Sequence, residues 1–181
     1  ILFTHDTHDY LYPTTTLENG SPIAHGGAAK LKTLIQKNTD ENTLYLDAGD
    51  FSMGTLYQTL FSTEAPELRN LGQCGCAVTT FGNREFDYGL SGVTKMLKAA
   101  MKSGDTLPAI VQSNIDFSGE LTDEQKAFQK TLEEYGVKEY SIITKAGLKI
   151  GIFGLMGYDC IECTQSDLSY IDYMEAAKAT V

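Results

Sequence analysis

The stretch Ala77–Gly89, which reads AVTTFGNREFDYG, carries the pattern on which the predicted fold depends. It begins with a short apolar and β-branched run, Ala77 to Phe81, and continues into a turn of glycine, amide and charged residues. A run of this length that is bounded by glycine is typical of a buried strand. The polar residues therefore follow the carboxyl end of a predicted strand.

The same pattern occurs in three other segments. Strand-like runs lead into polar clusters at Ile1 to Thr4 followed by His5-Asp6-Thr7-His8-Asp9, at Leu44 to Leu46 followed by Asp47-Ala48-Gly49-Asp50, and at Ala109 to Gln112 followed by Ser113-Asn114-Ile115-Asp116. A single cluster of this kind is usually a turn or a helix cap. Four of them at successive strand ends indicate a shared site, because ligands of open α/β sheets bind beyond the carboxyl ends of the strands.

Helical periodicity separates the strand candidates. Apolar residues share one helical face at Ala28, Leu31, Leu34 and Ile35, and again at Val93, Met96, Leu97, Ala100 and Met101. Capping-box spacing at Thr122 with Gln125 and at Asp172 with Glu175 predicts two more helices, with apolar positions at Phe128, Leu132 and Tyr135 and at Met174, Ala177 and Val181. This alternation predicts an α/β domain with a largely parallel sheet. Tyr140 to Thr144 and Lys149 to Phe153 either join that sheet or form a local hairpin around Ala146 and Gly147.

Composition narrows the classes of partner. The chain has 181 residues, of which 42% are hydrophobic, enough to build a core. Its 14 Lys and Arg against 24 Asp and Glu give a net charge of -10, which disfavours nucleic-acid polymers and anionic lipid. No window approaches the roughly 20 apolar residues of a membrane span. We therefore expect no nucleic-acid partner and no transmembrane segment.

The four cysteines form two close pairs, Cys74 with Cys76 and Cys160 with Cys163. Such spacing is compatible with a structural zinc site, with a disulfide in an exported protein, or with small buried side chains. The sequence leaves these alternatives open.

The residue types at the predicted strand ends point to bound metal. Asp6 and His8 lie two residues apart, so in extended backbone their side chains point the same way. Asp50 follows a glycine that permits a sharp turn, and Asn83 offers an amide oxygen. Carboxylates that converge in this way repel one another unless a cation lies between them. The pattern therefore predicts a centre of two divalent ions.

These residues resemble the calcineurin-like metallophosphoesterases, specifically the branch that contains 5'-nucleotidases, UDP-sugar hydrolases and 2',3'-cyclic-nucleotide phosphodiesterases. The matching set is Asp6-Thr7-His8, Gly26-Gly27, Gly49-Asp50, the run Gly82 to Gly89, Asn114 and the run Lys149 to Leu155. The resemblance implies a β-sandwich flanked by helices and two divalent ions, Zn, Mn, Fe or Mg. It implies that Asp6 and His8 bind the first ion, Asp50 bridges both, Asn83 binds the second, and Asn114 contacts the substrate.

The sequence departs from the family pattern at position 84. The family has a histidine there that assists the transition state or leaving group, supported by an aspartate at position 87, whereas this chain has Arg84 and Asp87. We expect both residues to act in catalysis, with Arg84 stabilising negative charge. Arginine does not release a proton at working pH, so it cannot serve as a general acid.

A second departure concerns the later histidines of the family. The chain has only His5, His8 and His25. His25, directly before Gly26, is interpreted as a local cap or surface residue. The resemblance thus implies that residues 1–181 are the N-terminal portion of a metallophosphatase domain, incomplete at the C-terminus. The rest of the catalytic domain and a C-terminal nucleotide-binding domain are expected beyond Val181.

The expected function is hydrolysis of a phosphoric ester, in which a water activated by two metal ions attacks the phosphate of a nucleotide. One alternative is a nucleotide- or phosphate-binding relative whose catalysis is impaired by Arg84. Another is a structural module whose polar clusters are ordinary turns. The resemblance also implies a secreted or cell-surface protein, as relatives commonly are.

Overall fold

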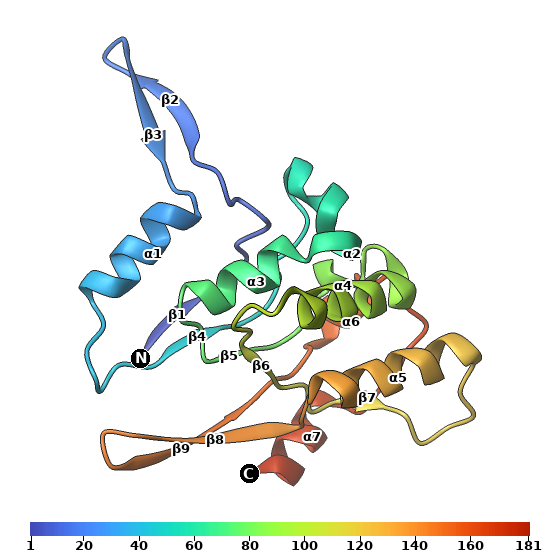
Figure 1. Ribbon diagram of the computed structural model, residues 1–181. Helices are drawn as coiled ribbons and strands as arrows, with labels where there is room; N and C mark the ends of the chain where they lie inside the picture. The colour runs from blue at the N-terminus through green and yellow to red at the C-terminus, as the bar shows by residue number, and fades with distance from the viewer.

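A four-stranded parallel sheet forms the centre of the computed structural model, which describes all residues from 1 to 181 (Figure 1). Its strands are β1 (Leu2–Thr4), β4 (Tyr45–Asp47), β5 (Val78–Thr79) and β6 (Ala109–Ile110), adjacent in that order. These are the four strands that the apolar runs predicted, and their parallel pairing confirms the α/β class. Because all four run the same way, their carboxyl ends meet at one edge of the sheet.

Helices supply most of the core beside this sheet. The longest, α4 (Gly89–Ser103), buries Val93, Met96, Leu97 and Ala100, as its periodicity predicted. It begins at Gly89, whose φ of 64° glycine adopts without strain. The rings of Phe81 and Phe86 pack edge to face with centroids 5.8 Å apart. Aromatic packing therefore fixes the turn after β5 on the core.

The helix α5 (Asp123–Tyr135) begins with the predicted capping box. The Thr122 hydroxyl accepts from the backbone N–H of Gln125, and the Gln125 side chain accepts from the backbone N–H of Thr122. Phe128 and Leu132 are buried as predicted. This helix packs against α4, next to the edge where the turn after β5 lies.

The last helix, α7 (Tyr173–Thr180), begins at its predicted cap, Asp172, whose carboxylate accepts from the backbone N–H groups of Met174 and Glu175. Its predicted apolar face was wrong. The buried residue is Ala176, whereas Met174 and Val181 are exposed. The helix has only about two turns, and the small residue Ala176 is the one that is buried. Three spaced apolar residues were too few to predict which face of so short a helix is buried.

Two antiparallel hairpins stand beside the sheet. The strands β8 (Tyr140–Lys145) and β9 (Leu148–Phe153) pair through a turn at Ala146 and Gly147, both with positive φ, so the hairpin alternative is confirmed. The hairpin of β2 (Thr14–Glu18) and β3 (Ser21–His25) projects from the body in Figure 1 and was not predicted. All ten of its strand residues are exposed, so the apolar alternation of a half-buried strand is missing. The signal for it was the Asn19-Gly20 turn.

The helix α1 (Ala28–Lys37) is present as predicted, but Leu34 of its expected apolar face is exposed. Several short elements were not predicted. They are η1 (Leu56–Leu60), α2 (Phe61–Glu64), α3 (Pro66–Gln73) and α6 (Tyr158–Glu162), the turn η2 (Arg84–Phe86), and the strand pair β7 (Ile115–Asp116) with β10 (Ser169–Tyr170). These elements are brief, and the periodicity test needs longer windows.

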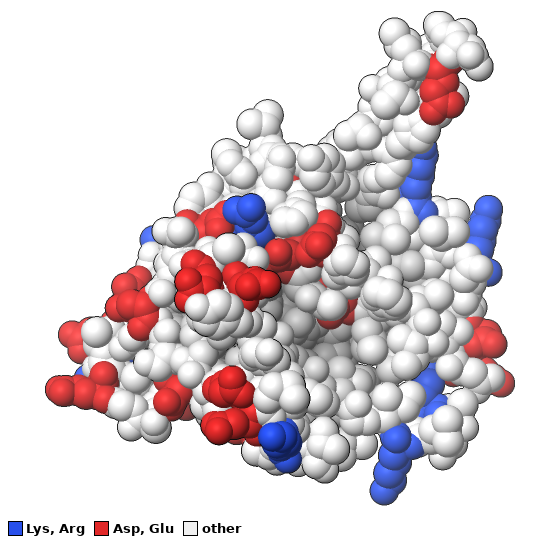
Figure 2. All heavy atoms as spheres, turned by 180° about the vertical axis from the view of Figure 1, so that it is seen from behind, with Lys and Arg blue, Asp and Glu red and all other residues white.

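The surface is predominantly acidic. Asp and Glu side chains form several patches on the face seen from behind, and basic side chains there are fewer (Figure 2). None of the helices combines the length and apolar character that crossing a membrane requires. The expected lack of a nucleic-acid partner stays a prediction.

Candidate metal centre

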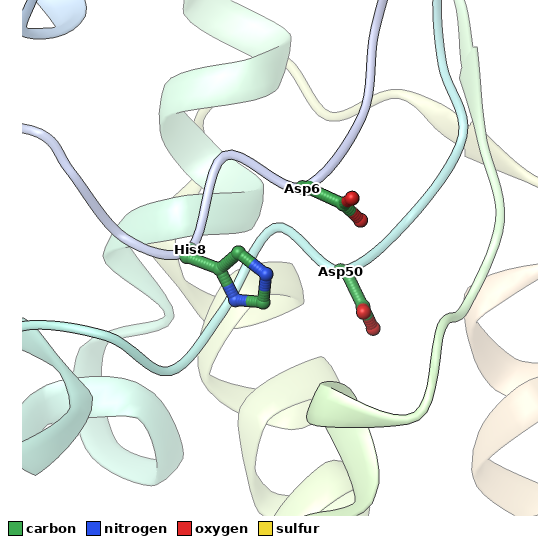
Figure 3. A group of neighbouring side chains, drawn as sticks. All are labelled: Asp6, His8 and Asp50. Carbon is green, nitrogen blue, oxygen red and sulfur yellow. The ribbon is translucent and has the colours of Figure 1, made fainter. Parts of the chain in front are cut away.

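Three predicted ligands meet at the carboxyl edge of the sheet. Donor atoms of Asp6, His8 and Asp50 all lie within 4.8 Å of one another. Figure 3 shows the two carboxylates directed to the same side of their loops, with the imidazole ring beside them. Two carboxylates and an imidazole nitrogen form a donor set that suits zinc, manganese or iron.

Backbone pairing continues past the strand ends and aligns the two loops that carry these ligands. The backbone N–H of Asp6 donates to the carbonyl of Gly49 at 3.1 Å, and that of His8 donates to the carbonyl of Asp50 at 3.1 Å. The loop after β1 therefore runs alongside the loop after β4.

Strained backbone is concentrated in the same two loops. Eight residues other than glycine have positive φ, and five of them lie here: Asp6, His8, Asp9, Asp50 and Met53. Such residues cost about 1–3 kcal/mol each and persist where the surrounding structure fixes them, commonly at functional sites. The strain therefore supports a functional role for this edge.

Glycines allow the loops to approach closely. A Cβ atom at Gly82 would lie 2.0 Å from Asp50 Oδ1, and one at Gly54 would lie 2.4 Å from the carbonyl oxygen of His8. Neither position has room for a side chain.

The hydrogen bonds of His8 determine which ring nitrogen is available. Its Nδ1 lies 2.9 Å from the carbonyl oxygen of Met53, which only accepts, so Nδ1 carries the proton and donates. The other nitrogen, Nε2, is then free to bind a metal ion, the arrangement usual for metal-binding histidines.

Glu85 connects the loops of the candidate site and was not predicted from the sequence. Its side chain is fully buried and accepts four hydrogen bonds, listed here: from the backbone N–H of Asp50 at 3.1 Å, of Ser52 at 3.0 Å and of Gly82 at 2.7 Å, and from the Ser52 hydroxyl at 2.8 Å. Burial raises the pKa of Glu85 to about 7, although several of these bonds oppose the rise. Glu85 thus joins the loop after β4 to the turn after β5. The sequence feature that could have identified Glu85 is its position inside the run Gly82 to Gly89.

The turn after β5 also brings in Arg84 and Asp87. The Arg84 backbone N–H donates to Asp50 Oδ1 at 2.9 Å, and its guanidinium Nη1 donates to Asp87 Oδ2 at 3.3 Å. The Arg84 side chain is half exposed. The guanidinium therefore pairs with Asp87, while the Arg84 backbone holds the Asp50 carboxylate, and the roles of Arg84 and Asp87 in catalysis stay predictions.

Asn83 lies beside this turn, and its amide oxygen meets Cys160 of α6. The distance from Cys160 Sγ to Asn83 Oδ1 is 3.7 Å. Burial, and then the negative charge of Asp50, raise the pKa of the Cys160 thiol to about 11. All four cysteines are free, and the site of Asp6, His8 and Asp50 is the one group of metal-type ligands, so the four thiols share no zinc site.

Asn114 is held by hydrogen bonds to backbone groups and to Gln112. It is fully buried, its Nδ2 donates to the carbonyl of Met156 at 2.9 Å, and its Oδ1 accepts from the backbone N–H of Met156 at 3.0 Å. Nδ2 also reaches the Ile171 carbonyl at 3.4 Å, and Gln112 Nε2 donates to Oδ1 at 3.0 Å. Asn114 therefore anchors the segments after β9 and β10, and its contact with substrate stays a prediction.

The other two histidines lie on the surface. His25 is exposed as predicted, and its Nε2 lies 3.0 Å from Glu18 Oε1 across the β2–β3 hairpin. His5 is exposed too, and its Nδ1 lies 3.1 Å from Asp6 Oδ2.

Comparison with known proteins places this geometry in a family. The chain is 30% identical over 195 residues to the trifunctional nucleotide phosphoesterase YfkN of Bacillus subtilis, a match that covers 96% of this chain and 13% of that protein. It is 30% identical over 198 residues to a probable 5'-nucleotidase of Treponema pallidum, covering 100% of this chain and 29% of that protein. A scan against protein-family models gives no match.

Solved structures agree. The fold matches the 5'-nucleotidase precursor of Thermus thermophilus with a TM-score of 0.77 and 26% identity, covering 98% of this chain and 32% of that one. It matches the NAD nucleotidase of Haemophilus influenzae with a TM-score of 0.68 and 29% identity, covering 98% and 34%. The chain thus spans about a third of these structures and less of the curated relatives. Relatives and structural neighbours together show that the chain belongs to the 5'-nucleotidase family of calcineurin-like metallophosphoesterases.

Proposed function

We propose that the protein to which residues 1–181 belong hydrolyses the phosphate ester of a nucleotide with two divalent metal ions. The observation that carries the proposal is the convergence of Asp6, His8 and Asp50 donor atoms within 4.8 Å. The names of the relatives, nucleotide phosphoesterase and 5'-nucleotidase, supply the substrate class.

Each ligand has a role in this proposal. Asp6 and the Nε2 atom of His8 would hold the first ion, Asn83 Oδ1 the second, and Asp50 both. Two such ions, when bound, supply the positive charge that holds phosphoryl oxygens and lowers the pKa of water. That charge is what this acidic chain otherwise lacks. The remaining ligands and a nucleoside-binding domain are proposed to come from outside residues 1–181.

The chain's own residues hold this arrangement rigid. Glu85 fixes the Asp50 backbone through a hydrogen bond, and the hydrogen bond from His8 Nδ1 to Met53 fixes the ring orientation. The charged guanidinium of Arg84 would stabilise negative charge that develops on the phosphate.

A second candidate function is binding of a nucleotide or phosphate without hydrolysis. The observation in its favour is the ion pair of Arg84 with Asp87, at 3.3 Å, where the family resemblance places a histidine. A fixed guanidinium can hold an anion but cannot donate a proton to a leaving group, and loss of such a transfer costs about 10²- to 10⁴-fold in rate.

Turnover of a nucleoside monophosphate by the full-length protein with Mn²⁺ or Zn²⁺ tests both proposals. We expect phosphate release by the wild type that Asp50→Asn abolishes. Lys126→His, which places a histidine on the exposed face of α5, is the control for Arg84→His. Binding without hydrolysis that Arg84→His converts into turnover would favour the second function. Lack of turnover in both the wild type and Arg84→His would refute the catalytic proposal.

The cellular location is a further part of the proposal. A secreted or surface-bound protein is what the family resemblance implies, and fractionation of the source cells tests it.

A further inference from the structure

A cavity of about 430 Å³ lies between α1, α3 and the loop after β1. Phe51, from the loop after β4, forms part of its wall, and none of the four proposed metal ligands lines it. Tyr10 and Leu34 line it and are exposed, so the cavity opens to solvent. Its volume is in the range of about 300–1,000 Å³ that is usual for small-molecule sites. The cavity is therefore a candidate binding site apart from the metal centre.

The wall of this cavity includes a buried carboxyl group without a partner. Glu67 of α3 is only 2% exposed, and neither of its carboxyl oxygens has a hydrogen-bond partner. Glu85, which is also buried, accepts four hydrogen bonds. A buried polar group that lacks a partner is costly, and a ligand that binds to Glu67 would remove this cost.

The charges around Glu67 favour a cationic ligand. Burial raises the pKa of Glu67 to about 8, against the opposing effect of its own backbone N–H, and the negative charge of Asp9 raises it further. Asp9 is buried as well, and its carboxyl oxygens also have no partner. The one basic side chain in the cavity wall, that of Lys30, is exposed and donates to the carbonyl of Ala24 instead. A basic nitrogen in the cavity would therefore offset the negative charge, whereas an anion would add to it.

The remaining wall is largely apolar. Leu11, Leu31, Phe51 and Leu71 line the cavity, and Phe51 and Leu71 are at most 2% exposed. A bare metal ion would fill little of this volume and would leave the apolar side chains against water. A ligand that carries an apolar body beside its basic nitrogen matches both parts of the wall.

We propose that the cavity binds a small amine, whose protonated nitrogen pairs with the carboxylate of Glu67 and whose apolar body packs against Leu31, Phe51 and Leu71. The ammonium group donates the hydrogen bonds that the two oxygens of Glu67 accept. This inference goes beyond the proposed function, because it uses none of the residues assigned to catalysis or metal binding.

The main alternatives are water alone and an anion held by Lys30. Water would satisfy Glu67 without any preference among organic ligands, and an anion would bind to Lys30 rather than to Glu67. Three probes of similar size separate these cases: phenethylamine is cationic, phenethyl alcohol is neutral, and phenylacetate is anionic.

Calorimetric titration of the full-length protein with each probe measures the preference. We expect phenethylamine to bind about 10-fold or more tightly than phenethyl alcohol, because a hydrogen bond to a charged group is worth this much. Phenylacetate should bind more weakly than both. Saturating Mn²⁺ should leave the phenethylamine affinity unchanged, since Mn²⁺ would occupy the metal centre and not the cavity.

Two variants locate the bound amine. Glu67→Gln keeps the shape of the side chain and removes its charge, so it should abolish the preference for the amine over the alcohol. Glu41→Gln, at an exposed glutamate, is the matched control and should retain this preference. Ala28→Phe adds a ring at the first residue of α1, which lines the cavity, and should weaken binding of the amine and the alcohol alike.

Equal affinity for the amine and the alcohol, tighter binding of phenylacetate, or no binding of the amine would overturn the inference. An unchanged preference in Glu67→Gln, or displacement of the amine by Mn²⁺, would place the ligand elsewhere and overturn it as well. The proposed function is independent of these results, because nucleotide turnover is measured without the amine. Amine binding in a protein without turnover would remove that function and keep the cavity assignment.

Discussion

Replacement of Glu85 by glutamine tests whether this buried carboxylate holds the loops of the candidate metal site in place. Oε1 accepts the two hydrogen bonds from Ser52, and Oε2 accepts those from the backbone N–H groups of Asp50 and Gly82. Glutamine has the same shape but turns one acceptor oxygen into an NH₂ donor.

The size of the effect follows from which donors lose their acceptor. The less costly orientation puts the NH₂ group at the position of Oε1, where the Ser52 hydroxyl can rotate and accept. The backbone N–H of Ser52 then remains buried without a partner, which costs about 1–3 kcal/mol. We therefore expect Glu85→Gln to lower the free energy of unfolding by about 2 kcal/mol. Metal affinity should fall about 10- to 100-fold, because Glu85 supports the Asp50 backbone.

Urea unfolding of metal-free protein and calorimetric titration with Mn²⁺ measure the two effects. Ser52→Ala removes one of the four donors and should cost about 1 kcal/mol. Glu41→Gln is the control, because Glu41 is exposed and should change stability by less than about 0.5 kcal/mol. If Glu85→Gln matches Glu41→Gln in stability and binds Mn²⁺ like the wild type, Glu85 does not position the loops.

Two further predictions concern neighbouring buried positions. Gly82→Ala should weaken metal binding at least 10-fold in the same titration. The added Cβ would lie 2.0 Å from Asp50 Oδ1 and 2.8 Å from the Asp50 backbone nitrogen. Gly119→Ala is the control, because a Cβ at Gly119 would meet no atom within 4 Å. Glu67 is buried without a hydrogen-bond partner, and burial, with added repulsion from other carboxylates, raises its pKa from 4.5 to about 8. The protonated form of Glu67 therefore stabilises the folded state at low pH, and this stability is lost as the pH rises from 4.5 to about 8. Unfolding measured across this window should show a slope from this group of at most about 1.4 kcal/mol per pH unit, and an unchanged slope in Glu67→Gln would contradict the assignment.

The sequence by itself determined the sheet and the three residues of the candidate metal site. Four apolar runs, each followed by polar residues, predicted β1, β4, β5 and β6 in a parallel sheet, and parallel strands must present their carboxyl ends at one edge. The meeting of Asp6, His8 and Asp50 follows from that rule. Local chemistry likewise determined the start of α5, because the capping box of Thr122 and Gln125 involves residues only three apart.

Only the tertiary structure decided which polar residues bind each other and which face the site. Glu85 is polar in a polar motif, and nothing in its neighbours along the chain shows that it also accepts from Asp50 and Ser52, more than 30 residues away in the loop after β4. Asn114 lies in a predicted site cluster, but the packing of the segments after β9 and β10 buries it. Cys160 reaches Asn83 only because α6 folds back onto the sheet edge. Periodicity and capping act over a few residues, whereas these contacts join segments that pack together only once the core has formed.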